Sequence, residues 1–308
     1  MKLRIGSRGS QLALWQAHHI EALLKGQGHE VEIEIIKTTG DRLQEVTFAQ
    51  VGSKGMFTKE IEEALAEGRV DLAVHSLKDL PTELPEPFAL AATPARVDPR
   101  DVLVSVNYKS LAEIPGGAKI GTSSQRRRAQ LKALRPDLEA VEFRGNVDTR
   151  LRKLAEGQVS AILLAAAGLD RLGKTDWVRE RMSPSAFCPA AGQGSLGIET
   201  RKGDAQTIDA LSFLDHAATR FAVTAEREAL AALGGGCQVP IGIHCRTAQA
   251  GWEIFGVVAA PASGQAIRIH HALPSEDADP VALGRLAARM LLDAGARAVL
   301  DCAAEAAE

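Results

Sequence analysis

Residues 70–81 read VDLAVHSLKDLP, a short apolar run that ends in a polar turn. The run from Val70 to Val74 is typical of a buried strand, and the segment from His75 to Pro81 breaks it. In α/β domains, ligands gather outside the carboxyl ends of such strands. Asp79, which stands beside Lys78, is therefore a candidate acid, base or cation-stabilising group. The alternative is a turn aspartate close to a proline, which is common.

Strands and helices alternate on both sides of this turn. Upstream, the pattern predicts strands at 3–5 and 31–36, a helix capped by Ser10, and a second helix over 58–67. A second series of the same kind follows a proline-containing linker near 94–99. This alternation predicts parallel or mixed sheets with helices packed against them.

The order of these elements divides the chain into three predicted domains. Residues 1–95 form an α/β domain, which a glycine-rich return at 189–198 extends by residues 195–213. Residues 100–190 form a second α/β domain with a basic face, and residues 216–308 form a smaller α+β domain. The Ala-rich C-terminal tail is expected to be frayed.

Composition indicates a globular protein without a general affinity for polyanions. The chain has 308 residues, 45% hydrophobic and 24% charged, with a formal net charge of -3. Neither a signal-peptide core nor an apolar run of membrane-spanning length is apparent, so we expect a soluble cytoplasmic protein that does not engage a membrane. The 4 cysteines have no zinc-binding spacing, so no metal is expected, and Cys188 and Cys245 are interpreted as structural.

Basic residues concentrate between 119 and 152. Arg126 and Arg127 stand just inside one predicted helix, and Arg144 and Arg150 flank the start of another. Helix N-termini attract anions, and arginine grips carboxylates with two parallel hydrogen bonds. The alternative is a solvated basic face, and Arg128 is expected to face solvent in that way. With 4% aromatic residues, several small carboxylates fit this region better than a nucleic acid does.

Cys237 lies in the segment GGGCQVPIG at 234–242. The preceding glycines permit backbone conformations closed to other residues and remove side-chain bulk, which can expose a thiol to a large ligand. A thiolate is a strong nucleophile, and one without a base of its own suits attachment better than turnover. On the residues alone, a tight structural turn and an attachment point remain equally open.

Eight segments together resemble the porphobilinogen deaminases, also called hydroxymethylbilane synthases. The resemblance covers nearly the whole chain, and the KDLP and GGGCQVPIG segments are its most specific parts. The segments are SRGS at 7–10 followed by LALWQA, GSKGMFTKE at 52–60, VHSLKDLP at 74–81, IGTSSQRRRAQL at 120–131, FRGNVDTRL at 143–151, AGLDRL at 167–172, PAAGQGSLGIE at 189–199 and GGGCQVPIG at 234–242.

The resemblance implies a fold and an activity. The fold is two periplasmic-binding-protein-like (type II) α/β domains plus a smaller α+β C-terminal domain. The activity is that of a transferase that condenses four porphobilinogen molecules, with loss of ammonia, onto a dipyrromethane cofactor joined by a thioether to Cys237. Water then releases hydroxymethylbilane for porphyrin and heme biosynthesis. The catalytic aspartate of the family falls on Asp79, and the enzyme is expected to be a monomer.

The resemblance also assigns residues that bind the cofactor and the substrate. Their shared property is a positive charge or a hydroxyl group that suits the acetate and propionate arms of each pyrrole. They are Arg8, Ser10, Lys54, Ser76, Lys78, Thr122, Ser124, Arg126, Arg127, Arg144, Arg150 and Arg171. The loop from Thr38 to Lys54 is interpreted as a cover over the site. The alternative functions are a non-catalytic, binding-protein-like carboxylate sensor, which would leave Cys237 unmodified, and a nucleic-acid binder.

Overall fold

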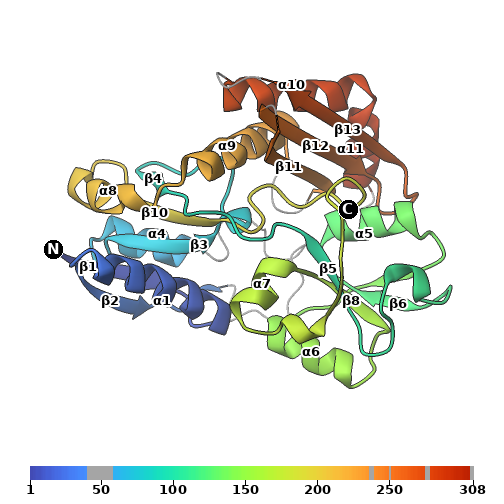
Figure 1. Ribbon diagram of the computed structural model, residues 1–308, viewed down its shortest axis with the longest axis horizontal. Coiled ribbons are helices and arrows are strands. Elements are labelled where there is room, and N and C mark those ends of the chain that lie inside the picture. Colours follow the sequence, from blue (N-terminus) through green and yellow to red (C-terminus); the bar gives the residue numbers. More distant parts are fainter. Residues whose placement is uncertain (40–57, 236–238, 250, 275–277, 306–308) are drawn as a thin grey trace. The chain divides into compact units, whose positions relative to one another are not determined.

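The computed structural model describes residues 1–39, 58–235, 239–249, 251–274 and 278–305. The chain falls into two compact units (Figure 1). The first comprises Met1–Val97 with Gly194–Arg220, and the second comprises Asp98–Gln193 with Phe221–Glu308. The division into three domains stays a prediction.

The first unit is built on a five-stranded mixed sheet with the order β2-β1-β3-β10-β4. β1 runs parallel to β2 and β3, whereas β10 is antiparallel to β3 and β4. The strands are β1 (Lys2–Ser7), β2 (Glu30–Ile35), β3 (Leu72–Ser76), β4 (Phe88–Ala92) and β10 (Leu196–Arg201). The helices are α1 (Gln11–Gly26), α4 (Lys59–Ala66), α8 (Ala205–Leu211) and the 3-10 helices η1 (Leu77–Asp79) and η4 (Ser212–Leu214).

Alternating apolar residues give this sheet a buried face. Leu3 of β1, Leu72 of β3 and Ile20 of α1 are fully buried in one cluster, where α1 packs on the sheet (Figure 1). The predicted cap is confirmed, because the Ser10 side chain accepts a hydrogen bond from the amide of Ala13 at 3.3 Å. The sheet and its first helix therefore form as the sequence pattern predicts.

The second unit contains another five-stranded sheet, with the order β7-β6-β8-β5-β9. β6 runs parallel to β7 and β8, and β5 is antiparallel to β8 and β9, so the strand arrangement of the first unit recurs. The strands are β5 (Asp101–Val104), β6 (Lys119–Gly121), β7 (Glu139–Val141), β8 (Ala161–Ala165) and β9 (Val178–Arg181). The helices are α5 (Gln125–Leu134), α6 (Val147–Ala155), α7 (Ala166–Arg171) and the 3-10 helices η2 (Leu111–Glu113) and η3 (Thr175–Trp177).

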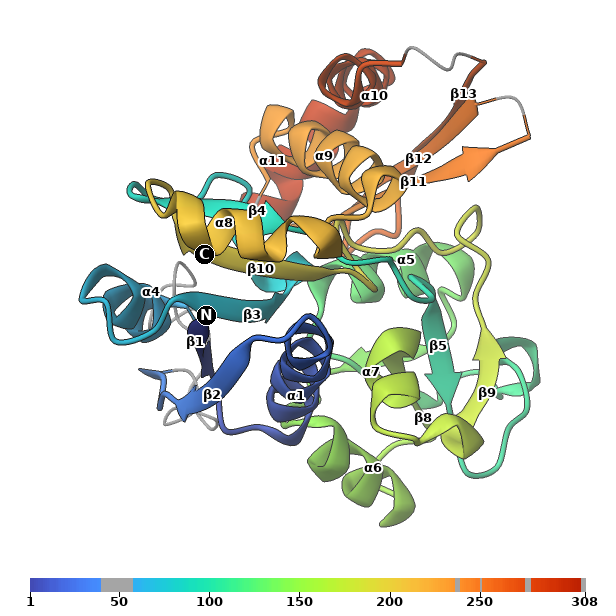
Figure 2. The ribbon, with the colours of Figure 1, turned by 60° about the vertical axis from the view of Figure 1, so that its left-hand side comes forward.

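A three-stranded antiparallel sheet completes the second unit, and helices pack against it (Figure 2). Ile243, Ile254 and Leu291 lie in its core. Its elements are β11 (Ile241–Ala248), β12 (Gly251–Ala259), β13 (Ala266–Leu273), α10 (Pro280–Asp293) and α11 (Ala296–Glu305), together with most of α9 (Ala217–Ala232), which begins in the first unit. Val299 of α11 is buried in the same core, and the fraying expected for the Ala-rich tail beyond it stays a prediction, because residues 306–308 lie outside the described residues.

The predicted fold class is confirmed. Two α/β assemblies, each with a five-stranded mixed sheet, are followed by a smaller α+β assembly with a three-stranded sheet. In the part of the chain that the structure describes, no helix has both the length and the apolar character needed to cross a membrane.

Candidate active site

The turn that carries Asp79 is anchored on both sides by buried leucines. β3 ends at Ser76 and η1 follows directly. Leu77 and Leu80 are 1% and 3% exposed, and the amide of Leu77 donates to the carbonyl of Ser195 at 3.0 Å. Asp79 itself is exposed. The fold therefore holds this carboxylate at the surface on a backbone that is fixed from behind.

Other predicted residues of the first unit reach the same edge of the sheet. β1 and β3 are parallel neighbours, with Gly6 opposite Ala73, so the residues after each strand emerge side by side. These residues include Arg8, Ser10, Ser76, Lys78 and Asp79. The hydroxyl of Ser76 is 2.8 Å from Nε2 of Gln16, which donates to it from α1. This edge therefore combines hydroxyl groups, cations and one exposed carboxylate.

In the second unit, the two predicted hydroxyl residues shape the start of α5. Oγ1 of Thr122 accepts from the amide of Ser124 at 3.2 Å, and Oγ of Ser124 accepts from the amide of Arg127 at 3.4 Å. Ser124 is therefore the N-cap of this helix. The capping places Arg126 and Arg127 in the first turn, as the sequence predicts.

Arg126 and Arg127 both contact the carboxylate of Asp101, which lies outside the basic segment 119–152. Nη1 of Arg126 lies 2.6 Å from Oδ2 of Asp101, and Nε of Arg127 lies 2.8 Å from Oδ1 of the same residue. Asp101 is fully buried. Burial alone would raise the pKa of Asp101, but the charges of Arg126 and Arg127 hold it well below its ordinary range. The three side chains therefore form a buried ionic cluster.

Arg150 and Arg171 are cations that are largely removed from water. Burial and, to a smaller extent, the positive charge of Arg127 lower the pKa of Arg150 to about 10. Burial likewise lowers the pKa of Arg171 to about 10. Nε of Arg150 is buried without a hydrogen-bond partner. Both cations would gain from an incoming anion, as expected at a functional site.

The parallel strands of the second sheet explain why the predicted cations gather. β6 is parallel to β7 and β8, so the segments that follow these strands share one edge. Arg144 lies in the loop after β7, where its Nε donates to Glu142 at 2.6 Å, and Arg171 ends the helix that follows β8. The residues on this edge are Thr122, Ser124, Arg126, Arg127, Arg144 and Arg150. Lys54, Cys237 and most of the predicted cover loop lie outside the described residues.

Sequence analysis missed three buried polar residues around these groups. Asp101, Gln193 and Glu226 are all at most 1% exposed. The carboxylate of Glu226 accepts from the amides of Gly192 and Cys245, each at 2.7 Å. A charged residue that opens or interrupts an apolar run, as Asp101 does before VLV, was the available signal. Its partners could not be identified because they are distant in sequence.

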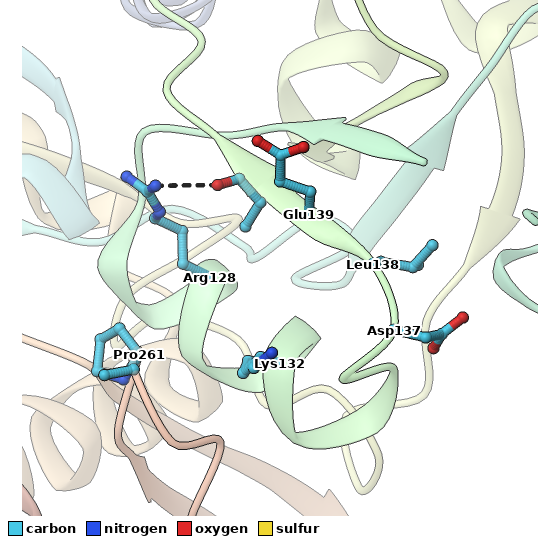
Figure 3. A pocket seen from close by; sticks show the side chains of 8 residues that line it. Arg128, Lys132, Asp137, Leu138, Glu139 and Pro261 are labelled. Atoms are coloured by element: carbon cyan, nitrogen blue, oxygen red, sulfur yellow. Dashed lines mark hydrogen bonds between the residues drawn. The ribbon is translucent and has the colours of Figure 1, made fainter. Parts of the chain in front are cut away.

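A shallow groove of about 390 Å³ lies beside this region, at the far end of α5 (Figure 3). Arg128 and Lys132 line it together with Asp137 and Glu139. Arg128 is only partly exposed, since its Nη2 donates to the carbonyl of Ala140 at 2.9 Å. None of the predicted site residues lines this groove.

In the described part of the chain, the side chains that could ligate a metal do not form a cluster. Cys188 and Cys245 are buried, in agreement with a structural role, and burial raises the pKa of the Cys188 thiol. Among the residues that the structure describes, no group of three or more His, Cys, Asp or Glu side chains could hold a metal ion.

Family models match the chain over most of its length. Residues 3–209 match "Porphobilinogen deaminase, dipyromethane cofactor binding domain", and residues 220–293 match "Porphobilinogen deaminase, C-terminal domain". The chain belongs to the porphobilinogen deaminase family. The resemblance seen in the sequence is therefore confirmed.

Individual porphobilinogen deaminases are similar to nearly the full chain. The enzyme of Nitratidesulfovibrio vulgaris Miyazaki F is 53% identical over 270 residues, which is 87% of this chain and 85% of that protein. The enzyme of Trichlorobacter lovleyi is 49% identical over 302 residues, which is 97% of this chain and 96% of that protein. Among solved structures, a nutrient-binding protein from Burkholderia cenocepacia overlaps 68% of this chain and 90% of that one, with 14% identity and a TM-score of 0.44.

Proposed function

We propose that this protein is a porphobilinogen deaminase (hydroxymethylbilane synthase). It joins four porphobilinogen molecules, with loss of ammonia, to a covalently held dipyrromethane primer, and water then releases hydroxymethylbilane. The observation that carries the proposal is Asp79, an exposed carboxylate held on a fixed turn beside Lys78, directly after the carboxyl end of β3. Because the chain belongs to the porphobilinogen deaminase family, we propose that this carboxylate acts on porphobilinogen.

The cofactor fits the charge pattern of the second unit. A dipyrromethane bears several carboxylates, and Arg150 and Arg171 are cations whose pKa values are lowered mainly by their removal from water. When bound, the dipyrromethane supplies the pyrrole to which new units are added. We propose Cys237 as the attachment point, through a thioether, because a thioether is not displaced during turnover as an acyl link would be.

The residues of the chain divide into two proposed roles. Asp79 stabilises positive charge on the reacting pyrroles and assists the proton transfers. The basic and hydroxyl residues bind the acetate and propionate arms of the cofactor and substrate. They are Arg8, Ser10, Lys54, Ser76, Lys78, Thr122, Ser124, Arg126, Arg127, Arg144, Arg150 and Arg171.

The proposal extends to the state of the enzyme. We infer a cytoplasmic monomer that engages no nucleic acid, as expected from the sequence. The alternative of a non-catalytic carboxylate sensor is not favoured, because relatives at 53% and 49% identity are named porphobilinogen deaminase.

The Asp79→Asn variant tests the catalytic role. The amide keeps the shape of the side chain but can neither accept a proton nor balance a cation. We expect the rate of porphobilinogen consumption to fall by a factor of about 100 or more, which is the usual contribution of a positioned acid or base. Asp209→Asn, at an exposed position of the same unit, serves as the control and should retain full turnover. Normal turnover by Asp79→Asn would refute the assignment.

A further inference from the structure

Asp101 occupies an unusual position at the first residue of β5. Its side chain is fully buried, yet it is charged and binds three partners. Oδ2 lies 2.6 Å from Nη1 of Arg126, and Oδ1 lies 2.8 Å from Nε of Arg127. Oδ1 also accepts from Nε2 of Gln193 at 3.1 Å. A carboxylate this deeply buried is retained only with strong partners, because its desolvation is costly.

The cluster is not electrically balanced. One carboxylate faces two guanidinium groups, so the three side chains of Asp101, Arg126 and Arg127 together keep one positive charge. Their proximity is also evident at Arg150, where the charge of Arg127 disfavours a further cation. The excess positive charge suits a region that receives carboxylates.

Hydrogen bonds also join this cluster to the backbone near both ends of the segment Asp98–Gln193. Nε2 of Gln193 donates to the carbonyl of Pro99 at 2.7 Å as well as to Asp101. Nη1 of Arg126 donates to the carbonyl of Cys188 at 2.6 Å. Gln130 of α5 contacts Cys188 from the other side, at 2.7 and 2.9 Å. The orientation of both arginines is therefore fixed by the backbone around them and by Asp101.

We propose that Asp101 is a positioning residue for carboxylate recognition: by holding Arg126 and Arg127 in place, it sets where the acetate and propionate arms of the cofactor and substrate bind. This inference rests on the proposed function. Asp101 contacts no reacting atom in this account, and it acts through the two arginines. It assigns a role to a residue outside the predicted basic segment.

A matched control lies three residues upstream. Asp98 accepts from Arg100 at 2.7 Å and from Arg181 at 2.8 Å, so it is also a carboxylate shared between two arginines. Neither arginine belongs to the predicted site. Asp98→Asn therefore removes a carboxylate shared by two arginines from the same unit without touching Arg126 or Arg127, although Arg181 keeps Asp170 as a second partner. If the removal of any such carboxylate from this unit slowed loading, both asparagine variants would load slowly.

The test uses the full chain produced without cofactor. Wild type, Asp101→Asn, Asp101→Glu and Asp98→Asn are incubated with porphobilinogen, and the mass gained on the protein is followed over time. We expect Asp101→Asn to load at least about 10-fold more slowly than wild type and, once loaded, to show a KM raised by a similar factor. Asp101→Glu should recover part of the loss, and Asp98→Asn should stay within about 2-fold of wild type.

The outcomes separate this inference from the proposed function. A wild-type protein that gains no mass would refute the proposed function. Loading and KM values for Asp101→Asn that equal those of Asp98→Asn, with wild type loading normally, would refute only the role of Asp101. If Asp101→Asn does not fold, Asp101→Glu takes its place, because it keeps the charge but moves the carboxylate by one methylene relative to Arg126 and Arg127. Loading of that folded variant at the wild-type rate would likewise overturn the inference.

Discussion

We propose that Arg150 is a residue that serves binding at the expense of stability. Its guanidinium is largely shielded from water, its pKa is lowered to about 10, and its nearest recorded hydrogen bond, from Nη2 to Oγ of Ser123, is long at 3.5 Å. A buried cation with so little compensation costs free energy in the absence of an anion. Such a cost is typical of residues retained for binding.

The Arg150→Met variant should therefore be more stable and less active. We expect the free energy of unfolding to rise by about 1 kcal/mol, because an undercompensated charge is replaced by an apolar side chain. The KM for porphobilinogen should rise at least about 10-fold, because a bidentate contact is lost. Urea unfolding and steady-state kinetics measure the two effects. Arg152→Met on the same helix, whose side chain is 63% exposed, should change neither; a destabilised Arg150→Met would contradict the account.

Glu62 gives a pH-dependent prediction. Burial raises its pKa above the ordinary value of 4.5, and the nearby charge of Glu199 raises it further. A carboxyl whose pKa is raised by folding weakens the fold as pH rises above 4.5, because the folded state resists its ionisation. Glu62→Gln should therefore be more stable than wild type at pH 7.5, by about 1 kcal/mol or less.

The stability advantage of Glu62→Gln should shrink as the pH falls toward 4.5 and vanish below it, where wild-type Glu62 becomes protonated in both states. Thermal unfolding across this pH range measures it. The neighbouring Glu63→Gln, at an exposed position, should show no such trend. A pH-independent difference between Glu62→Gln and wild type would contradict the interpretation.

At the scale of the element, the short helix η1 determines where Asp79 lies. Gly197 of β10 packs directly behind it: a Cβ atom there would come within 2.9 Å of Cδ1 of Leu77 and 3.2 Å of Cδ1 of Leu80. These two leucines anchor η1 on either side of Asp79. The absence of a side chain at Gly197 therefore permits the turn to sit close against the sheet.

Gly197→Ala should accordingly displace the turn. We expect a loss of about 1–3 kcal/mol in the free energy of unfolding, as is usual for overpacking in a core, together with a lower kcat. Thermal denaturation and turnover assays test this. Gly203→Ala, where a Cβ meets no atom within 4 Å, is the control and should behave as wild type. An unchanged kcat in Gly197→Ala would show that the position of η1 is not critical.

Local signals predicted the elements better than their long-range partners. Ser10 was predicted to be a helix cap, and its side chain accepts a hydrogen bond from the first turn of the helix. The C-terminal helix α11 was missed because alanine-rich sequence gives little periodicity, and its stability comes from packing of Val299 in the core. The sequence pattern identified Arg126 and Arg127 but not Asp101, since no local rule joins a strand start to a helix 25 residues away.

At the scale of the whole molecule, several cations gather in one unit although the net charge of the chain is negative. The net charge is -3, yet the second unit collects the buried cations Arg126, Arg127 and Arg171 and the partly buried Arg150. The first unit supplies the exposed carboxylate of Asp79. A chain built in this way concentrates anion binding and acid–base chemistry without becoming a general polyanion binder.

The central claim is that Cys237 carries a dipyrromethane. The most direct measurement is the intact mass of the purified protein, followed by peptide mapping of its cysteines. We predict an excess mass equal to one dipyrromethane, located on Cys237, either as purified or after incubation with porphobilinogen. A mass equal to the bare sequence after that incubation, or the added group on Cys188, Cys245 or Cys302, would contradict the account.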